Sequence, residues 1–440
     1  MDLLTADIKK TYLRYFWAAI GASLVTSIYS LVDTIAIGQY EGPNGTAALA
    51  TTQTIWTVMI CLGILIGVGG SIMMSTCRGG GRTEEGNQYF TLSLLCSVLC
   101  SAVITVLFQI FQEQILIFSG SDQQILPYAL RYSKWLILAM PLFMISITLG
   151  DFIRNDNAPE VPSRAVIIGG IANMIGDYLF VFVFDMGIAG AGLATALGQL
   201  LCFCTNLSYL FTKRCSLRLV WPKKWLSKLG RILTGGMAPF LIDLSFGVMV
   251  LLFNNQIRRY AGNTELAVFG AVSNLAILFQ ALFYGVGRAL QPLASTNMGA
   301  GQYDRARTTL RYGLISALLM GGLFAGGSLL FPEPILQAYM KVTPEVLAAG
   351  PGILRVYATS FFLMGVNVVV SYYLQAVLQK FGSLLVSLLR GIIFCAAYIY
   401  LLPLLFGFDA IWWSMPLTEL STCLAAVLIL LHTEKKEGRG

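Results

Sequence analysis

Charged residues are scarce in this sequence. Asp, Glu, Lys and Arg make up 12% of its 440 residues, about half of the roughly 25% that is typical of soluble domains. Hydrophobic residues make up 56%, and the mean hydropathy is +0.73. So few charges exclude a soluble domain of useful size, and the composition predicts a membrane protein that crosses the bilayer many times.

Histidine and paired cysteines are also lacking. The single histidine, His432, excludes a metal centre built from several histidines, and none of the nine cysteines forms a Cys-x-x-Cys pair. Neither a zinc knuckle nor a disulfide framework is therefore indicated. Because an enzyme embedded in the membrane needs a metal cluster or a nucleophile with its base, we expect no enzymatic activity and no cofactor.

What the sequence does contain is a series of apolar runs, each long enough to cross a bilayer as a helix. Polar residues, glycine or proline separate these runs, and we count twelve of them. We therefore expect an all-α protein with twelve transmembrane helices. The runs lie near residues 12–37, 47–76, 89–111, 132–153, 164–184, 188–211, 231–257, 265–290, 310–331, 351–378, 382–406 and 409–432.

The distribution of Lys and Arg along the chain predicts its orientation. If both termini are cytoplasmic, 21 of the 29 basic residues fall in cytoplasmic segments and six on the opposite side. Membrane proteins accumulate positive charge on the cytoplasmic side, so this bias predicts that both ends are inside. The net charge of +7 then belongs to loops that face an anionic leaflet, and we expect no nucleic-acid partner.

An internal repeat divides the chain into two halves of six runs each. Gly-Val-Gly at 67–69 corresponds to Gly-Val-Gly at 285–287, and each is followed by a glycine-rich inner loop. We expect an N-terminal lobe at 1–212, a basic cytoplasmic linker at 213–230 and a C-terminal lobe at 231–440. Six runs per half give both halves the same orientation, and such parallel repeats are typical of transporters with a substrate path between the halves.

Five acidic residues fall inside the predicted spans, where a carboxylate costs about 2.5–3.5 kcal/mol on insertion scales. Asp33 and Asp177 lie at similar depth in the first and fifth spans, and Asn173 lies one helical turn before Asp177. Two carboxylates and an amide oxygen that converge are hard ligands for Na⁺, or sites that take up a proton. We therefore predict a cation-coupling site at these three residues. The alternative is that both acids are protonated and serve only in hydrogen bonds within the bundle.

The other charges within the spans permit simpler interpretations. Asp151 stands three residues before Arg154, so pairing or snorkelling at a helix end accounts for it, with an additional cation site as the alternative. Asp243, in the middle of the seventh span, is a candidate to bind a cation or a cationic substrate. Arg390 and Glu419 lie at similar depth in consecutive antiparallel spans, which predicts an internal ion pair.

Several motifs, taken in order along the chain, resemble those of the multidrug and toxic compound extrusion (MATE) transporters, in particular their bacterial MepA/DinF-like branch. The resemblance runs from about residue 15 to residue 430. It rests on YSLVDTIAIG (29–38), GVGGSIMMSTCRGGGRTEEGN (67–87), IRNDNAPEVPSRA (153–165), ANMIGDYLFVF (172–182), GIAGAGLATALGQ (187–199), QPLASTNMGAGQYDRAR (291–307) and YLQAVLQKFGSLLVSLLR (373–390).

The resemblance implies two six-helix lobes, alternating access, and export of organic cations or amphiphiles in exchange for entering H⁺ or Na⁺. The family's aspartate on the first span and its Asn-x-x-x-Asp on the fifth correspond here to Asp33, Asn173 and Asp177. The sequence departs from its relatives at Ala18, where proline is usual, and at Arg288, where a neutral polar residue is common.

We therefore expect a cation-coupled secondary antiporter in the bacterial cytoplasmic membrane. We expect it to export small organic cations or amphiphiles and to work as a monomer among membrane lipids, with H⁺ and Na⁺ as alternative coupling ions. The rival is a flippase for a lipid-linked precursor from the same broad superfamily. Such a flippase needs several cations in its cavity to bind a pyrophosphate, and the spans contain only Arg288 and Arg390 against five acids.

Overall fold

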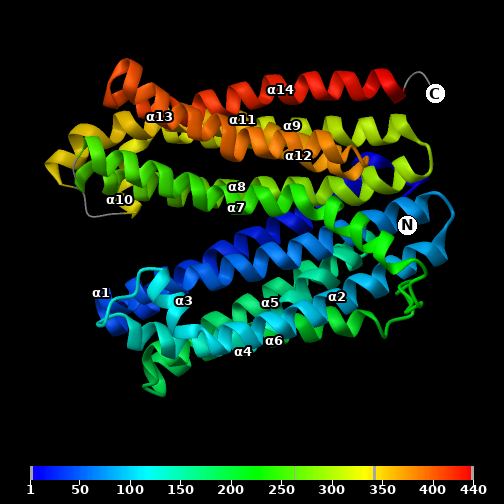
Figure 1. The fold of residues 1–440 in the computed structure, drawn as a ribbon, viewed down its shortest axis with the longest axis horizontal. Coiled ribbons are helices and arrows are strands. Elements are labelled where there is room, and N and C mark those ends of the chain that lie inside the picture. The colour runs from blue at the N-terminus through cyan, green and yellow to red at the C-terminus, as the bar shows by residue number, and fades with distance from the viewer. Residues whose placement is uncertain (1–2, 262, 340–342, 438–440) are drawn as a thin grey trace. The chain divides into compact units, whose positions relative to one another are not determined.

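The computed structural model describes residues 3–261, 263–339 and 343–437. Within these residues, twelve helices are long and apolar enough to cross a membrane (Figure 1). Each of the twelve apolar runs falls on one of these helices, so the predicted all-α fold with twelve spans is confirmed. The side chain of His432 lies outside the described part of the chain.

In the first half of the chain, α1 (Ile8–Gly79) contains two spans, Ile8–Gly42 and Asn44–Gly79. The helix breaks at Gly42, whose φ of 69° lies in the left-handed region that glycine adopts without strain. The other elements of this half are α2 (Thr83–Ile110), α3 (Gln112–Phe118), α4 (Leu126–Asn155), α5 (Glu160–Gly176), the π-helix η1 (Asp177–Val183) and α6 (Gly187–Tyr209).

The second half repeats this order of elements. The short helix α10 follows the third span of its half as α3 does in the first, and a second π-helix, η2, interrupts the eleventh span as η1 interrupts the fifth. Its elements are α7 (Trp225–Tyr260), α8 (Asn263–Gly299), α9 (Tyr303–Leu330), α10 (Pro332–Tyr339), α11 (Pro344–Ala376), α12 (Lys380–Leu388), η2 (Leu389–Ile393), α13 (Phe394–Phe406), the 3₁₀-helix η3 (Phe408–Trp413) and α14 (Ser414–Glu437).

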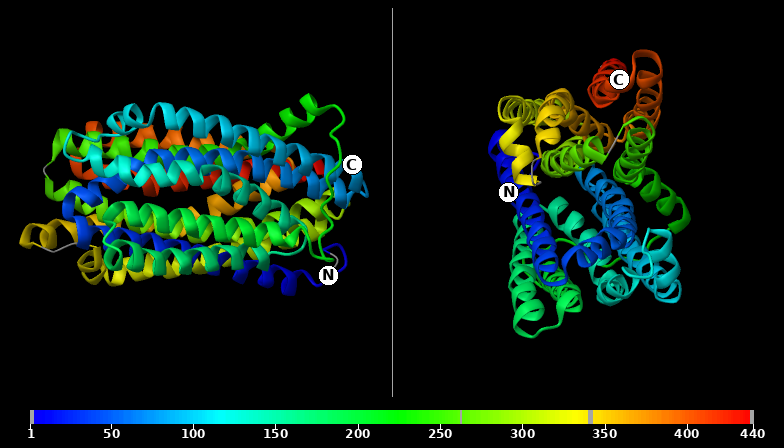
Figure 2. Two further views of the ribbon diagram at one scale, coloured as in Figure 1. Left: turned by 90° about the horizontal axis from the view of Figure 1, so that it is seen from below. Right: turned by 90° about the vertical axis from the view of Figure 1, so that its left-hand side faces the viewer.

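The described residues form two compact units. Of the described residues, unit 1 contains 3–6 and 17–240, and unit 2 contains 7–16 and those from 241 to 437. The helices of each unit run alongside one another, as the views along and across their length show (Figure 2). The sequence predicts a boundary at the linker 213–230, whereas this linker and the start of α7 pack within unit 1.

Hydrogen bonds and close packing explain why the linker belongs to unit 1. The backbone N–H of Val220 donates to Thr91 Oγ1 on α2 at 2.9 Å, and the N–H of Lys223 donates to Gln88 Oε1 at 3.3 Å. In α7, a Cβ atom on Gly236 would lie only 1.9 Å from the carbonyl oxygen of α1 Leu65. The linker and the start of α7 therefore pack closely against α2 and α1, although the composition of the linker is basic and typical of a loop.

The first turns of α1 belong to unit 2 for a similar reason. The Tyr12 hydroxyl donates to Ser316 Oγ on α9 at 2.9 Å, and the Tyr12 ring stacks on Tyr312 with centroids 5.9 Å apart. Helix α1 therefore contributes residues to both units. The predicted lobes at 1–212 and 231–440 differ from this, because they place all of α1 in the N-terminal lobe.

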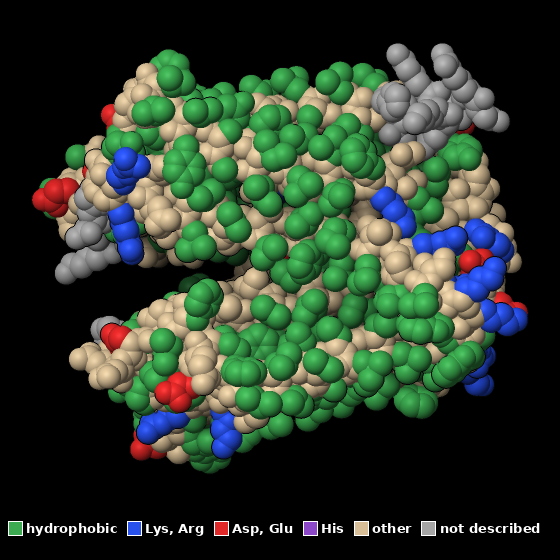
Figure 3. Space-filling view, in the orientation of Figure 1, with side chains coloured by type: hydrophobic (Ala, Val, Ile, Leu, Met, Phe, Trp, Pro, Cys, Tyr) green, Lys and Arg blue, Asp and Glu red, His purple; other side chains and the backbone are tan. Residues whose placement is uncertain are grey.

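The surface has the composition expected of helices that face lipid. Hydrophobic side chains cover the visible lengths of the helices, and Lys and Arg side chains gather near the helix ends (Figure 3). Leu99 on α2 and Leu319 on α9 are among the many large apolar side chains that are exposed. In water such a surface would aggregate, whereas in a bilayer it is the favourable one.

Candidate functional site

Asp33 lies on the first span of α1 and is buried in unit 1. The Tyr132 hydroxyl on α4 donates a hydrogen bond to Asp33 Oδ2 at 3.2 Å. The other carboxylate oxygen, Oδ1, is buried and has no hydrogen-bond partner among the described residues. One side of the Asp33 carboxylate is therefore held in place, and the other can accept a proton or bind a cation.

Close packing of α5 on α1 brings Asn173 to the height of Asp33. A Cβ atom on Gly170 would lie 2.9 Å from Val25 Cγ1 and 3.0 Å from the Tyr29 ring, so the two helices approach closely here. Asp33 lies one turn beyond Tyr29, and Asn173 lies about one turn beyond Gly170. As the first and fifth spans run in the same direction, both side chains lie at similar depth.

Close packing of α5 on α6 then orients Asn173. A Cβ atom on Gly169 would lie 2.6 Å from the carbonyl oxygen of Gly198, so these two positions are kept small. The side-chain amide of Asn173 donates to Thr195 Oγ1 on α6 at 3.2 Å. Its carbonyl oxygen, Oδ1, is buried and has no hydrogen-bond partner among the described residues, so the oxygen is available as a ligand.

Asp177 is fully buried and begins the π-helix η1, one turn after Asn173. Both of its carboxylate oxygens are buried, and in the described part of the chain neither has a hydrogen-bond partner. Asp177 lies four residues after Asn173 and therefore on the same face of the fifth span, one turn further along it. A π-turn is rare and occurs often at functional sites, because it changes the direction of one side chain within a continuous helix.

Together these residues form a cluster of buried oxygen atoms in unit 1. Asp33 Oδ1, Asn173 Oδ1 and both oxygens of Asp177 are left without hydrogen bonds among the described residues. Two nearby carboxylates cannot both remain ionised in an apolar bundle unless a cation or proton neutralises them. This donor set suits Na⁺, a hard cation, and it also suits a proton shared by the two acids.

The structure brings together all three residues that the sequence selects for cation coupling, and it adds Tyr132 and Thr195. These two hydroxyl groups escape prediction because tyrosine and threonine are common in transmembrane helices and cost little to bury when hydrogen-bonded. Only the approach of α4 and α6 to the cluster, which the sequence does not display, singles them out.

Asp151 lies elsewhere on α4 and forms an ion pair with Arg154, with Arg154 Nη1 at 2.7 Å from Asp151 Oδ1. The pair lies about 28 Å along the helix from Tyr132, from the helical rise per residue. The simpler interpretation from the sequence, pairing with Arg154, is therefore present in the structure. Asp151 does not join the cluster of Asp33.

Asp243 lies in unit 2, on α7, where the Tyr284 hydroxyl hydrogen-bonds to it and the charge of Arg288 acts on it. The charge of Arg288, for which the sequence offers no role, therefore acts on an acid of the same unit. A cation or substrate role for Asp243 remains a prediction.

The predicted ion pair between Arg390 and Glu419 is present in unit 2. Arg390 Nε lies 2.9 Å from Glu419 Oε1, and Nη2 lies 2.8 Å from the same oxygen. Asn367 Nδ2 on α11 donates to Glu419 Oε2 at 2.6 Å. Glu419 is fully buried and Arg390 nearly so, which makes this pair a connection between η2, α11 and α14.

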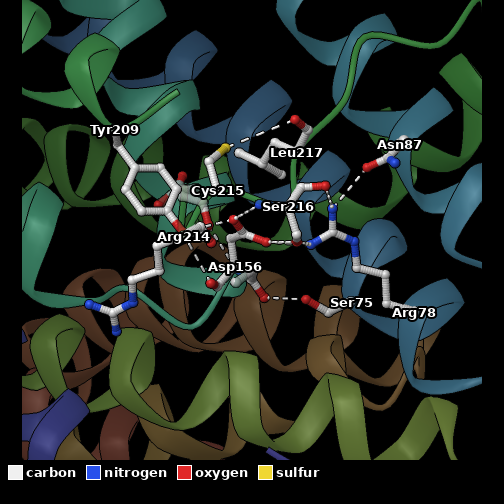
Figure 4. A network of polar contacts seen from close by, with 11 residues as sticks. Ser75, Arg78, Asn87, Asp156, Tyr209, Arg214, Cys215, Ser216 and Leu217 are labelled. Atoms are coloured by element: carbon white, nitrogen blue, oxygen red, sulfur yellow. Dashed lines mark hydrogen bonds and ion pairs between the residues drawn. The ribbon is translucent and has the colours of Figure 1, made fainter. Parts of the chain in front are cut away.

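A second polar network joins the linker to the helix ends of unit 1 (Figure 4). Asp156 Oδ1 accepts from Arg78 Nη1 at 2.6 Å, and Asp156 Oδ2 accepts from the Tyr209 hydroxyl at 2.8 Å and from the Ser216 N–H at 2.9 Å. Arg78 Nη2 also donates to Asn87 Oδ1 at 2.8 Å. The sequence gives no sign of this network, because each residue falls in a short polar loop or near a helix end.

Comparison with known proteins shows that the chain is similar to transporters. The MatE family model matches residues 18–179 and 240–401, one match in each half of the repeat. The multidrug export protein MepA of Staphylococcus saprophyticus is 26% identical over 420 residues, which cover 93% of this chain and 90% of that protein. MepA of Staphylococcus haemolyticus is 23% identical over 427 residues, which cover 97% and 94%.

Solved structures share the fold at low sequence identity. A MOP superfamily transporter from Pyrococcus furiosus superposes with a TM-score of 0.90 at 19% identity, over 99% of this chain and 97% of that chain. An outward-facing multidrug resistance MATE family transporter gives the same TM-score, identity and coverage. These structures confirm the MATE-type fold.

The twelve spans and the two corresponding halves define a multi-pass membrane transporter. Because the family model matches well over half of its length, the chain belongs to the MatE family, the multidrug and toxic compound extrusion transporters. The resemblance drawn from the sequence motifs is thereby confirmed.

Proposed function

We propose that this protein is a secondary antiporter of the bacterial cytoplasmic membrane, with both termini in the cytoplasm. Entry of H⁺ or Na⁺ drives the export of small organic cations or amphiphiles by alternating access, and the protein works as a monomer. Membership of the MatE family supports this proposal, as does similarity to relatives named as multidrug export proteins.

One observation carries the proposal: the cluster of Asp33, Asn173 and Asp177 buries four oxygen atoms that lack hydrogen bonds among the described residues. Unsatisfied buried oxygens destabilise a fold, and carboxylates do so most strongly. A cation or proton that binds there offsets this cost. Binding and release of this cation or proton therefore change the stability of the state in which α1, α4, α5 and α6 pack around the cluster.

Antiport requires that this binding be coupled to the substrate. The cation and the substrate must prefer opposite states of the transporter, because a ligand shifts an equilibrium only by its difference in affinity between the two states. Cation binding at the cluster then favours the state that releases substrate outside. Loss of the cation to the cytoplasm favours the state that binds substrate again.

Proteoliposomes test this proposal directly. We expect efflux of a fluorescent organic cation to be driven by an imposed pH gradient or an imposed Na⁺ gradient, but not by both, and to fall to background in Asp33→Asn and Asp177→Asn. Asp409→Asn, the same change at an exposed residue outside the cluster, should transport at the wild-type rate. Wild-type rates in the two cluster variants would contradict the coupling site.

The test also separates the rival function. If folded wild-type protein moves no organic cation under either gradient, the flippase of lipid-linked precursors becomes the better account. The structure offers little to favour it, because Arg390 is neutralised by Glu419.

A further inference from the structure

The first turns of α2 are covered on every side. All residues from 86 to 93 are buried, and such a run makes more than two full turns of helix. From Leu95 onward α2 exposes apolar side chains along one face, as a helix that faces lipid does. Leu99, for example, is 66% exposed and Val103 is 58% exposed. Another part of the protein therefore covers this face over the first turns.

The linker provides this cover. Gln88 and Thr91 lie seven and four residues before Leu95, so they belong to the face of α2 that is exposed further along. Gln88 Oε1 accepts a hydrogen bond from the backbone N–H of Lys223 at 3.3 Å. Thr91 Oγ1 accepts one from the backbone N–H of Val220 at 2.9 Å. The inner side of the linker is thus fixed to α2, and its outer side faces the surroundings in place of α2.

This stretch of the linker lies at the level of the lipid headgroups. Helix α2 has 28 residues and is therefore about 42 Å long, close to the thickness of a bilayer with its headgroups. Thr91 lies about 12 Å along the helix from its first residue, Thr83. Each headgroup layer is roughly 5–8 Å thick. The linker therefore lies beside this layer and its boundary with the acyl chains.

The outer side of the linker combines tryptophan with basic side chains. Trp221 is 80% exposed and Trp225 is 53% exposed. Lys223 and Lys224 lie between them in the sequence and are exposed, as is Arg218. Tryptophan is enriched where membranes meet water, because its ring is apolar and its N–H is polar. Basic residues at the same level attract anionic lipids.

The three basic side chains are not neutralised by the protein. Those of Arg218, Lys223 and Lys224 form no hydrogen bond or ion pair within the described residues, and the linker contains no acidic residue. Of the two acids in the first turn of α2, Glu85 is paired with other basic residues. Glu84 forms no ion pair with any of the three in the described part of the chain. The positive charge is therefore available to a ligand.

We propose that Arg218, Trp221, Lys223, Lys224 and Trp225 form a surface that binds the headgroup of an anionic phospholipid, which holds the linker on α2. The basic side chains bind the phosphate, and the tryptophan rings pack beside the glycerol and the upper acyl chains. This inference goes beyond the proposed function, because it depends neither on the coupling ion nor on the exported substrate.

Hydrogen–deuterium exchange of the full-length protein in lipid nanodiscs tests the proposal where the lipid is expected to bind. One set of nanodiscs contains phosphatidylcholine, and the other contains an equal mixture of phosphatidylcholine and anionic phosphatidylglycerol. Exchange at Val220 and Lys223 requires the linker to detach from α2. We expect exchange in these linker peptides to be about fivefold slower or more with phosphatidylglycerol, because each basic residue near an anionic surface contributes about a factor of five.

Three variants show which charges carry the effect, each measured as the ratio of its exchange rates in the two lipids. Lys223→Gln/Lys224→Gln should lose the slowing, and Lys223→Arg/Lys224→Arg should keep it. Lys9→Gln/Lys10→Gln removes the same charge from two exposed lysines at the start of α1 and should also keep it. Thermal unfolding and gel filtration confirm that all three variants are folded.

Several results would overturn the proposal. Equal exchange of the wild-type linker in the two lipids would show that no anionic lipid holds it. Loss of the slowing in Lys223→Arg/Lys224→Arg would show that positive charge is not what binds the lipid. An equal loss in Lys9→Gln/Lys10→Gln would indicate a diffuse attraction of the whole protein to an anionic membrane.

Inorganic phosphate distinguishes a lipid headgroup from a free anion. Added to the phosphatidylcholine nanodiscs, it should leave exchange of the linker unchanged, because it lacks the acyl chains beside which Trp221 and Trp225 pack. Slowing by phosphate equal to that by phosphatidylglycerol would overturn lipid binding in favour of a site for a free anion.

Discussion

At the scale of single residues, the two units neutralise their buried charges in different ways. In unit 2, Glu419 accepts hydrogen bonds from Arg390 and Asn367 and is fully paired within the protein. In unit 1, Asp33 accepts one hydrogen bond, from Tyr132, and in the described residues Asp177 accepts none. The first arrangement connects helices, and the second leaves carboxylate oxygens without hydrogen-bond partners among the described residues.

The structural role of the ion pair predicts a large loss of stability when it is broken. Glu419→Ala leaves the Arg390 guanidinium buried without its counter-charge, and we expect a loss of about 3–5 kcal/mol in the free energy of unfolding. Thermal unfolding in detergent measures this loss of stability. The double variant Arg390→Met/Glu419→Leu should recover most of this loss, because it removes both charges together.

The exposed Glu84→Ala variant is the control for this prediction, with an expected change within about 0.5 kcal/mol. If Glu419→Ala is as stable as Glu84→Ala, the pair does not connect η2, α11 and α14.

The sequence predicts these charged residues well and their uncharged partners poorly. Asp33, Asp177, Arg390 and Glu419 stand out because a charge inside an apolar run is costly and therefore rare. Hydroxyls such as those of Tyr132 and Thr195 give no comparable signal, since a transmembrane helix accommodates them easily. Their importance depends on which helices meet, which is a property of the packing.

At the scale of elements, the interruptions of the helices matter as much as the helices themselves. The π-helix η1 begins at Asp177, and the π-helix η2 contains Arg390 and Gly391. Both occur in the same span of their half, and both carry a buried charge. The twelve spans follow from the length of the apolar runs, but a π-turn shifts the register of a helix without any compositional mark, so the sequence does not reveal it.

The linker is the element whose place the sequence predicts least well. Its composition is basic and loop-like, yet its backbone bonds to α2, and Ser216 bonds to Asp156. These bonds depend on side chains from distant parts of the chain. The boundary between the units consequently falls at Phe240, beyond the predicted linker.

The attached linker predicts a slow, pH-dependent reaction at Cys215. Burial raises the pKa of the Cys215 thiol, with a further rise from the charge of Asp156. Because the thiolate is the reactive form, modification by a water-soluble maleimide should be slow at neutral pH and should increase at a higher pH than for an ordinary thiol.

The variant Asp156→Asn should speed this reaction several-fold, because it weakens the network that holds the linker and removes the nearby negative charge. Mass spectrometry of the Cys215 peptide over time gives the rate, with Asp409→Asn as the control. Equal rates in wild type and Asp156→Asn would show that the network does not restrain the linker.

At the scale of the whole molecule, the chain repeats its fold but not its chemistry. Both halves match the same family model, and both contain six spans, a short helix after the third span and a π-helix in the fifth. Unit 1 contains the acidic cluster, whereas unit 2 contains the Arg390–Glu419 pair. The two halves therefore share their elements but differ in how their buried polar groups are paired.

The central claim is that substrate and cation exchange at a coupling site formed by Asp33 and Asp177. Counterflow tests it most directly: vesicles are loaded with substrate and given no ion gradient, and an internal pH dye or radioactive Na⁺ reports cation entry as substrate leaves. The account predicts entry of one of the two cations in wild type and in Asp409→Asn, and none in Asp33→Asn. Substrate efflux without any cation entry in the wild-type protein would contradict it.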